Sequence, residues 1–275
     1  MPADTVADVK REILVRHLRT WAPSALHRGR RAAYLHGYAD DAPELAEAAL
    51  RVFAEQPDLV RGRELTMIAL GDSVGERLGK LPPAAGLTVH AIGGGTEERL
   101  GVAVKAAGAV RVPLLGFLDA SAASGPPALA TMKALAAGKP AEALVVLPAG
   151  SSVEDFRASL HEAGFPLVTA VEIAGPEQTI VYATTLGKSL EAFKDLVWAS
   201  GLGLDPDPEP LRRDLLAHLT EVGSATVAEL RGYTLTETVY RAADASQVLH
   251  TLLDAGSVTR RPEDGRLGGD VVITL

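Results

Sequence analysis

Acidic and glycine residues that could bind a ligand or act in catalysis follow four segments predicted as buried strands. They are Asp40 and Asp41 after the segment 32–37, Asp72 after 64–70, the run Gly93-Gly94-Gly95 after 87–92, and Asp119 after 112–118. In a doubly wound α/β sheet, ligands bind outside the carboxyl ends of the parallel strands. The spacing therefore predicts that these residues share one edge of a sheet and form a candidate site.

The loop after the first strand determines which ligand that edge accepts. A nucleotide-type cofactor needs glycines there, because side chains block its approach to the loop amides. This loop offers Gly37 and Ala39 as the small residues such a cofactor would contact, but Asp40 and Asp41 follow them. Like charges at close range cost on the order of 1 kcal/mol even in high dielectric, so the loop disfavours an anionic group. We interpret the two aspartates as helix caps, with cation binding or general-base catalysis as alternatives.

The loops after the second and third strands each allow two interpretations. Asp72 stands where cofactor-binding sheets have an acidic residue for the ribose hydroxyls, and it also suits a helix N-cap. Gly93 and Gly94 could present amides to an anion at a helix start. A flexible connector is the alternative, since Thr96-Glu97-Glu98 favours a helix start without a ligand.

Asp119 is the best candidate for a catalytic residue, because it closes the fourth strand; capping of the next turn is the alternative. The seven histidines lack the spacing of metal ligands, so we expect no metal site. The absence of cysteine excludes thiolate metal sites and cysteine nucleophiles. The sequence has neither the nucleophile elbow that is typical of serine hydrolases nor the P-loop of P-loop ATPases.

Helical and strand patterns alternate along the first 200 residues. An amphipathic helix is predicted over 5–21, interrupted by Pro23, and further helices are predicted over 43–53, 73–81, 97–107, 127–137, 153–163 and 190–200. Strands are predicted over 32–37, 64–70, 87–92, 112–118, 143–147, 167–173 and 179–184, the last two as an antiparallel pair. This alternation predicts a Rossmann-like, doubly wound and mostly parallel sheet over residues 1–200.

A second, smaller domain is predicted after a linker. Residues 201–210 are rich in glycine, proline and aspartate, which is typical of a linker. Helices over 211–222, 226–230 and 239–255, with strands over 257–261 and 270–275, predict a winged helix over 211–275. From Glu209 to Leu275 there are seven arginines, no lysine and ten carboxylates, a net charge of −3. This charge disfavours direct DNA binding and favours packing against another protein surface.

The composition limits the setting in which the protein works. The net charge of −8 disfavours broad adhesion to nucleic acid or anionic lipid. The amino-terminal residues are charged, and no apolar run approaches the roughly 18 residues of a membrane span. We therefore expect a soluble, cytoplasmic protein that binds proteins or small molecules and has no membrane partner.

Several short motifs occur in an order that points to one family. They are Lys10-Arg11-Glu12-Ile13-Leu14, Tyr34-Leu35-His36-Gly37-Tyr38-Ala39, Phe117-Leu118-Asp119, Gly125-Pro126-Pro127, Tyr182-Ala183-Thr184-Thr185, and the run from Leu190 to Trp198. Together they resemble the three-Cys-motif partner proteins, a bacterial family with a methyltransferase-like fold and a winged-helix tail. The resemblance implies a methyltransferase-type sheet, S-adenosylmethionine as the cofactor of an active member, and association with a cysteine-motif partner protein.

The sequence departs from the family pattern at both loops of the implied cofactor site. The family's first loop reads Tyr-Ile-Asp-x-Phe-Ala-Gly-x-Gly, and here its Asp is His36 while its last two glycines are Asp40 and Ala42. The Pro-Phe-Gly that follows the family's fourth strand is Ala120-Ser121-Ala122. These changes predict a catalytically degenerate protein that needs no cofactor and acts as a partner or regulatory subunit. The alternatives are an active, divergent methyltransferase or other small-molecule enzyme using this crevice, and a winged-helix transcriptional regulator.

Overall fold

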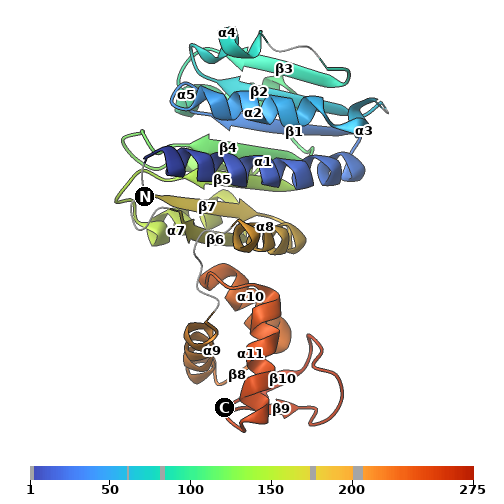
Figure 1. The fold of residues 1–275 in the computed structure, drawn as a ribbon, viewed down its shortest axis with the longest axis vertical. Helices are drawn as coiled ribbons and strands as arrows, with labels where there is room; N and C mark the ends of the chain where they lie inside the picture. The colour runs from blue at the N-terminus through green and yellow to red at the C-terminus, as the bar shows by residue number, and fades with distance from the viewer. Residues whose placement is uncertain (1–2, 61, 81–83, 174–177, 201–206) are drawn as a thin grey trace. The chain divides into compact units, whose positions relative to one another are not determined.

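The computed structural model describes residues 3–60, 62–80, 84–173, 178–200 and 207–275 (Figure 1). The chain forms two compact units, residues 1–189 and residues 190–275. Helix α8, Gly187–Ala199, begins in the first unit and continues into the second. Most of the linker predicted over 201–210 lies outside the described residues, and the domain bounds of 1–200 and 211–275 stay predictions.

The first unit alternates strands and helices as the sequence predicts. Its strands are β1 Arg31–Gly37, β2 Glu64–Leu70, β3 Leu87–Ile92, β4 Leu114–Asp119, β5 Ala141–Val146, β6 Leu167–Glu172 and β7 Thr179–Thr184. Its helices before α8 are α1 Ala3–Arg28, α2 Pro43–Ala54, α3 Pro57–Val60, α4 Val74–Leu78, α5 Thr96–Ala106, α6 Leu129–Leu135 and α7 Val153–Ala163. The single turn α3 is new, since no helix is predicted between residues 54 and 63.

The seven strands form one sheet in the order β3-β2-β1-β4-β5-β7-β6. The strands β1 to β5 are parallel, and β7 runs antiparallel between β5 and β6. The predicted antiparallel pair is thus confirmed. This order, with one reversed strand next to the last, is that of the Rossmann-like, methyltransferase-type fold. The predicted fold class is confirmed for this unit.

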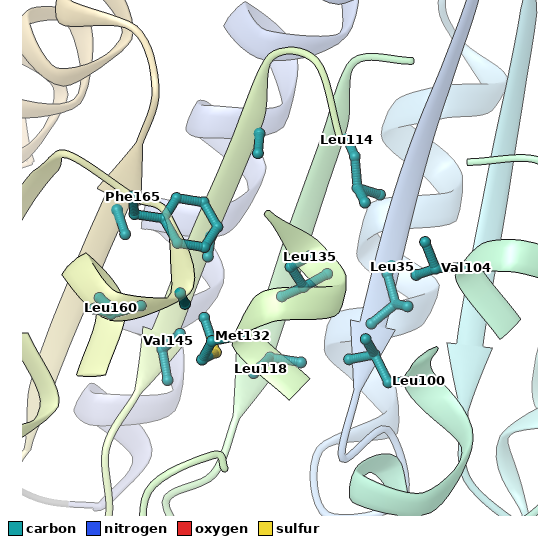
Figure 2. Close-up of a cluster of buried hydrophobic side chains, with 14 of the residues drawn as sticks. Leu35, Leu100, Val104, Leu114, Leu118, Met132, Leu135, Val145, Leu160 and Phe165 are labelled. Atoms are coloured by element: carbon teal, nitrogen blue, oxygen red, sulfur yellow. The ribbon is translucent and has the colours of Figure 1, made fainter. Parts of the chain in front are cut away.

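Apolar side chains bury both faces of the central strands. All six residues of β4 and of β5 are buried. Figure 2 shows the cluster on one face, where side chains of β1, β4 and β5 meet those of α5, α6 and α7. The labelled members are Leu35, Leu100, Val104, Leu114, Leu118, Met132, Leu135, Val145, Leu160 and Phe165. Helices α1 and α2 pack against each other over the opposite face (Figure 1).

Helix α1 is longer than the sequence predicts, because it continues through Pro23 to Arg28. A proline inside a helix costs about 3 kcal/mol, since it removes one backbone hydrogen bond and crowds the preceding turn. Trp21 and Ala22 before Pro23, and Ala25 and Leu26 after it, are all buried. Their burial offsets the cost, so tertiary packing overrides the local signal that Pro23 ends the helix.

Strand β3 forms one edge of the sheet and differs from the central strands. Among the described residues it pairs only with β2, its four middle residues are exposed, and no charged residue lies in the strand. Helix α5 packs over β1 and β2. The sheet therefore has a well-covered centre and one open edge.

The second unit contains the three helices and the hairpin predicted for a winged helix. Its elements are α9 Glu209–Val222, β8 Ser224–Thr226, α10 Val227–Glu237, α11 Ala242–Asp254, β9 Thr259–Arg261 and β10 Val272–Thr274. The added strand β8 pairs with β10 and completes a three-stranded sheet. Thr226 caps the start of α10 in a reciprocal pair with Glu229, and the helix continues to Glu237, beyond the predicted end at residue 230.

Within the described residues, no helix combines the length and apolar character needed to cross a membrane.

Candidate functional site

The carboxyl ends of β1, β2, β3 and β4 lie side by side, because these strands are parallel neighbours in the sheet. The last residues of these strands and the loops that follow them contain every site residue predicted from the sequence. Their contacts determine how much room this edge leaves for a ligand.

Asp40, in the loop after β1, binds the loop after β2. Its carboxylate accepts hydrogen bonds from the backbone amides of Asp72 and Ser73 at 2.6 and 2.9 Å, and from the Ser73 hydroxyl at 2.7 Å. Partial burial raises the pKa of Asp40, but these hydrogen bonds outweigh it and hold the pKa below its usual value. Asp40 therefore caps the loop that leads into α4, while Ala42 occupies the N-cap position of its own helix, α2.

The Asp40 carboxylate occupies the space beside Gly71. A Cβ atom at Gly71 would lie 2.6 Å from Asp40 Oδ1. Gly71, which follows β2, therefore has no side chain because the Asp40 carboxylate fills that space. That glycine leaves no added room for a ligand.

Asp72 connects the loop after β2 to the loop after β3. Its Oδ1 accepts a hydrogen bond from the Gly94 amide at 2.7 Å, and a Cβ at Gly93 would lie 3.2 Å from the same oxygen. Gly94 has a φ of +107°, a backbone conformation that favours glycine. The N-cap position of α4 is held by Ser73. The glycine run thus directs one amide at a carboxylate of this chain, and Asp72 is not the N-cap.

Tyr38 joins the loop after β1 to the start of α5. Its amide donates to Thr96 Oγ1 at 2.7 Å, and its hydroxyl donates to Glu97. Burial and the hydrogen bond with Glu97 both raise the pKa of Tyr38. Its φ of 53° lies in the left-handed region, which is uncommon for a residue with a side chain. The turn at Tyr38 thus brings the loop after β1 onto α5.

Gly37 and Ala39 lie inside this set of contacts. A Cβ at Gly37 would lie 2.5 Å from a Leu118 methyl carbon and 2.8 Å from the methyl carbon of Thr96. Ala39 is fully buried, and its amide donates to the Leu70 carbonyl at 3.0 Å. Both small residues permit close packing of the loop against its neighbours.

Asp119, at the end of β4, is buried and ion-paired. Lys10 Nζ lies 3.1 and 3.2 Å from its two oxygens, and also donates to Ser121 Oγ at 2.9 Å. The amide and hydroxyl of Ser121 donate to Asp119 Oδ1. Asp119 thus caps the turn after β4 and is also the counter-ion of Lys10.

His36 lies next to this pair, at the end of β1. It is fully buried, and Nδ1 lies 2.8 Å from the Tyr34 hydroxyl oxygen. Burial lowers the pKa of His36 to about 4, although the charge of Asp119 opposes the shift. Nε2 has no hydrogen-bond partner among the described residues. His36 is therefore neutral at pH 7.

A pocket of about 490 Å³ lies between α1, the start of α2 and the end of β4. Lys10 and Asp119 form part of its wall, together with Asp41 and Glu44 at the start of α2. Asp72, Gly93 and Gly94 do not line it. The predicted site residues therefore separate into a hydrogen-bonded set across β1, β2 and β3, and Asp119 at a pocket beside α1. Over the described ranges, no group of three or more histidine and acidic residues could hold a metal ion.

Three residues that make these contacts were not predicted as site residues: Lys10, Tyr38 and Ser121. Lys10 is 109 residues from Asp119, and pairs so far apart leave no spacing signal. A weak signal was present nonetheless, because Lys10 lies four residues after Val6 and three before Ile13 on the apolar stripe of α1. A charged residue on a buried helix face usually has a partner.

Comparison with known proteins gives matches among solved structures only. No protein-family model matches the chain, and no curated protein matches it. One structural neighbour is EvdMO1, with 14% identity and a TM-score of 0.43 over 65% of this chain and 42% of that one. A second is a putative O-methyltransferase from Nostoc punctiforme, with 11% identity and a TM-score of 0.37 over 62% of this chain and 60% of that one.

A third neighbour is human methyltransferase-like protein 13 in complex with SAH. It shows 14% identity and a TM-score of 0.40 over 73% of this chain and 94% of that one. The chain thus spans less than two thirds of the length of the first two neighbours. The fold assignment rests on the strand order described above.

Proposed function

We propose that this chain is a catalytically degenerate methyltransferase-like protein that acts as a partner or regulatory subunit of another protein. The observation that supports this most is the contact of Asp40 with the loop after β2. The carboxylate accepts the amides of Asp72 and Ser73, at the sheet edge where a doubly wound fold binds its ligand.

The donors that a cofactor would use are taken by the protein itself. Backbone amides at the strand ends are the groups that hold anionic or hydroxyl groups of a nucleotide-type ligand. The amides of Asp72, Ser73 and Gly94 all donate to carboxylates of this chain. A cofactor would have to replace charge-assisted hydrogen bonds, which are stronger than neutral ones. The proposal therefore includes no resident cofactor.

The state of Asp119 supports the same proposal. A general base needs a carboxylate oxygen within hydrogen-bond reach of the substrate's proton. Both oxygens of Asp119 contact Lys10, and one also accepts from Ser121. In this arrangement Asp119 stabilises the fold at the end of β4 and holds α1 in place.

Calorimetry with S-adenosylmethionine and S-adenosylhomocysteine tests the loss of cofactor binding. We expect no measurable heat from either ligand with the wild-type chain. Micromolar binding that weakens in Asp119→Asn would contradict the proposal. The variant Lys133→Met, altered at an exposed ion pair, controls for unspecific effects of substitution.

The partner role needs a separate experiment. The full chain, tagged and expressed in its source cells, should form a stoichiometric complex with one protein, and mixing the purified pair should change the partner's activity or stability. The resemblance to the three-Cys-motif partner family makes a cysteine-motif protein the first candidate. A chain that stays alone after capture and cross-linking would contradict the partner role.

The pocket beside Asp119 favours one alternative, a small-molecule enzyme that uses this region. Such an enzyme could be a divergent S-adenosylmethionine-dependent methyltransferase. Mass spectrometry of the protein under native conditions distinguishes the two. A stoichiometric small molecule that co-purifies with the wild-type chain would favour the enzyme.

A further inference from the structure

Strand β3 presents backbone hydrogen-bonding groups at the outer edge of the sheet. The carbonyls of Gly86 and Ile92 accept hydrogen bonds from amides near the two ends of β2, at 2.8 and 3.1 Å. Backbone groups alternate in direction along a strand, so those of Leu87, Val89 and Ala91 point away from β2. These three residues form the outer edge of β3.

The middle of this outer edge is open. The Leu87 amide donates to the Ala84 carbonyl at 3.2 Å, in the turn that precedes the strand. The amides and carbonyls of Val89 and Ala91 have no hydrogen bond with any described residue, and both side chains are exposed. Unpaired groups in this arrangement are a template for another strand.

Edge strands usually carry a feature that prevents such pairing, such as a charged side chain, a proline or a bulge. Strand β3 contains neither a charged residue nor a proline, and it pairs with β2 in one continuous register from Leu87 to Ile92. The opposite edge strand, β6, ends in the charged Glu172, and no other residue of β6 is exposed. Of the two edges, β3 is therefore the one open to a further strand.

A second copy of this chain fits the edge, because β3 can pair with itself. In an antiparallel pair, directly opposite residues lie on the same face and bond to each other through outward groups. The register centred on Val89 uses all three outward residues, since the Ala91 amide then meets the Leu87 carbonyl of the second copy in both directions. Like charges directly opposite are destabilising, and a strand without charged residues avoids this cost when it meets its own copy.

We propose that β3 pairs in antiparallel fashion with β3 of a second copy, across a two-fold axis at Val89, so that the two seven-stranded sheets become continuous. The Val89 side chain, 37% exposed in the single chain, packs against Val89 of the second copy. One strand pair is a small contact beside the roughly 1,600 Å² of a standard interface, so the dimer forms in a concentration-dependent way. The net charge of −8 on each copy opposes association, and added salt should strengthen it.

Sedimentation velocity of the full chain over a series of protein concentrations tests the proposal. The wild type should convert from monomer to dimer as the concentration rises. Val89→Lys and Val89→Glu each place like charges opposite each other, and each should weaken association by about tenfold or more. An equimolar mixture of the two variants should recover the dimer, because the register sets Lys opposite Glu.

A matched control comes from a valine of similar exposure outside the strand. Val110, 39% exposed, lies in the turn after α5, and Val110→Lys should associate as the wild type does. Circular dichroism melting curves check that each variant is folded. A wild type that is monomeric at every concentration, equal weakening in Val110→Lys, or no recovery on mixing would overturn the proposal.

Amide hydrogen exchange tests the strand pairing directly. With rising protein concentration, the amides of Val89 and Ala91 should exchange more slowly, whereas those of Thr88 and His90, which face β2, should change less. Protection that appears only when a different protein is added would assign the edge to that protein and overturn self-pairing. The inference does not rest on the proposed function, and none of these outcomes bears on S-adenosylmethionine binding, so the two proposals can fail separately.

Discussion

Lys10 and Asp119 form an ion pair between the opening helix and the end of β4, with 3.1 Å between Nζ and the nearer oxygen. Both side chains are largely buried, at 11% and 3% exposure. The pair links two parts of the chain that are 109 residues apart. It also connects the candidate site to the stability of α1.

Removing the cation from this pair should be costly. We expect Lys10→Met to lower the free energy of unfolding by about 3–5 kcal/mol, because it leaves the buried Asp119 carboxylate without a counter-ion. The double variant Lys10→Met/Asp119→Asn should recover part of this loss. Urea denaturation measures both, and Lys133→Met, from the exposed pair with Glu162, should change the same quantity by less than about 1 kcal/mol. If Lys10→Met and Lys133→Met lower the free energy of unfolding by the same amount, burial does not make the Lys10–Asp119 pair costlier to break than an exposed pair.

The contact between Asp40 and Gly71 should appear as coupling between two substitutions. Gly71→Ala places a Cβ 2.6 Å from Asp40 Oδ1 and should lower the free energy of unfolding by about 1–3 kcal/mol. In an Asp40→Gly background the same change should cost much less, because the carboxylate is gone. Chemical denaturation of the four proteins measures this coupling. Gly125→Ala, whose added Cβ meets nothing within 4 Å, is the control. Additive effects would show that the two residues do not compete for space.

Gly37 should behave as a packing residue. Gly37→Ala adds a Cβ only 2.5 Å from Leu118 and 2.8 Å from Thr96, so we expect a loss of about 1–3 kcal/mol in the free energy of unfolding, without any ligand present. Adding Leu118→Val, which shortens the closer neighbour, should recover part of the loss. An unchanged melting temperature in Gly37→Ala would indicate open space at this loop.

Two buried histidines predict a fall in stability at acidic pH. Burial lowers the pKa of His17 and of His36 to about 4, from 6.5 in an unfolded chain. As the pH falls from 6.5 to 4, the unfolded state therefore binds protons before the folded state does, and stability decreases by about 3 kcal/mol for each histidine.

The variant His36→Gln isolates one of these two contributions. It should reduce the slope of unfolding free energy against pH between 4 and 6.5 by about half, as measured by urea denaturation at several pH values. His250→Gln, at an exposed position, should keep the full slope. An unaltered slope in His36→Gln would mean that this histidine titrates alike in both states.

Most of the fold could be predicted because its signals are local. The apolar run 64–70 predicts β2 with the bounds that the structure shows, since a parallel strand buried on both faces needs no polar alternation. The passage of α1 through Pro23 could not be predicted, because the burial of residues on either side of it depends on distant elements, such as Phe53 of α2, whose ring lies 6.3 Å from that of Trp21. The short strand β8 was missed because three residues are too few for a period-2 pattern.

The candidate site was predictable in position but not in its contacts. Strand ends are visible in the sequence, so Asp40, Asp72 and Asp119 were found. The partner of each is a residue from another loop or helix, such as Lys10 for Asp119. Whether a carboxylate at a strand end meets a ligand or an amide of its own chain depends on loop paths that no local pattern specifies.

The contrast between β3 and the central strands affects how the protein opens in its native state. All residues of β4 and β5 are buried, whereas the middle of β3 is exposed and, in the part of the chain that the structure describes, the strand pairs with β2 alone. Amide hydrogens of β3 should therefore exchange with solvent through local openings that leave β4 intact. Such openings would release Gly94 from Asp72 while Lys10 still holds Asp119. The loops after β2 and β3 should therefore open at a lower free energy than the central strands of the sheet.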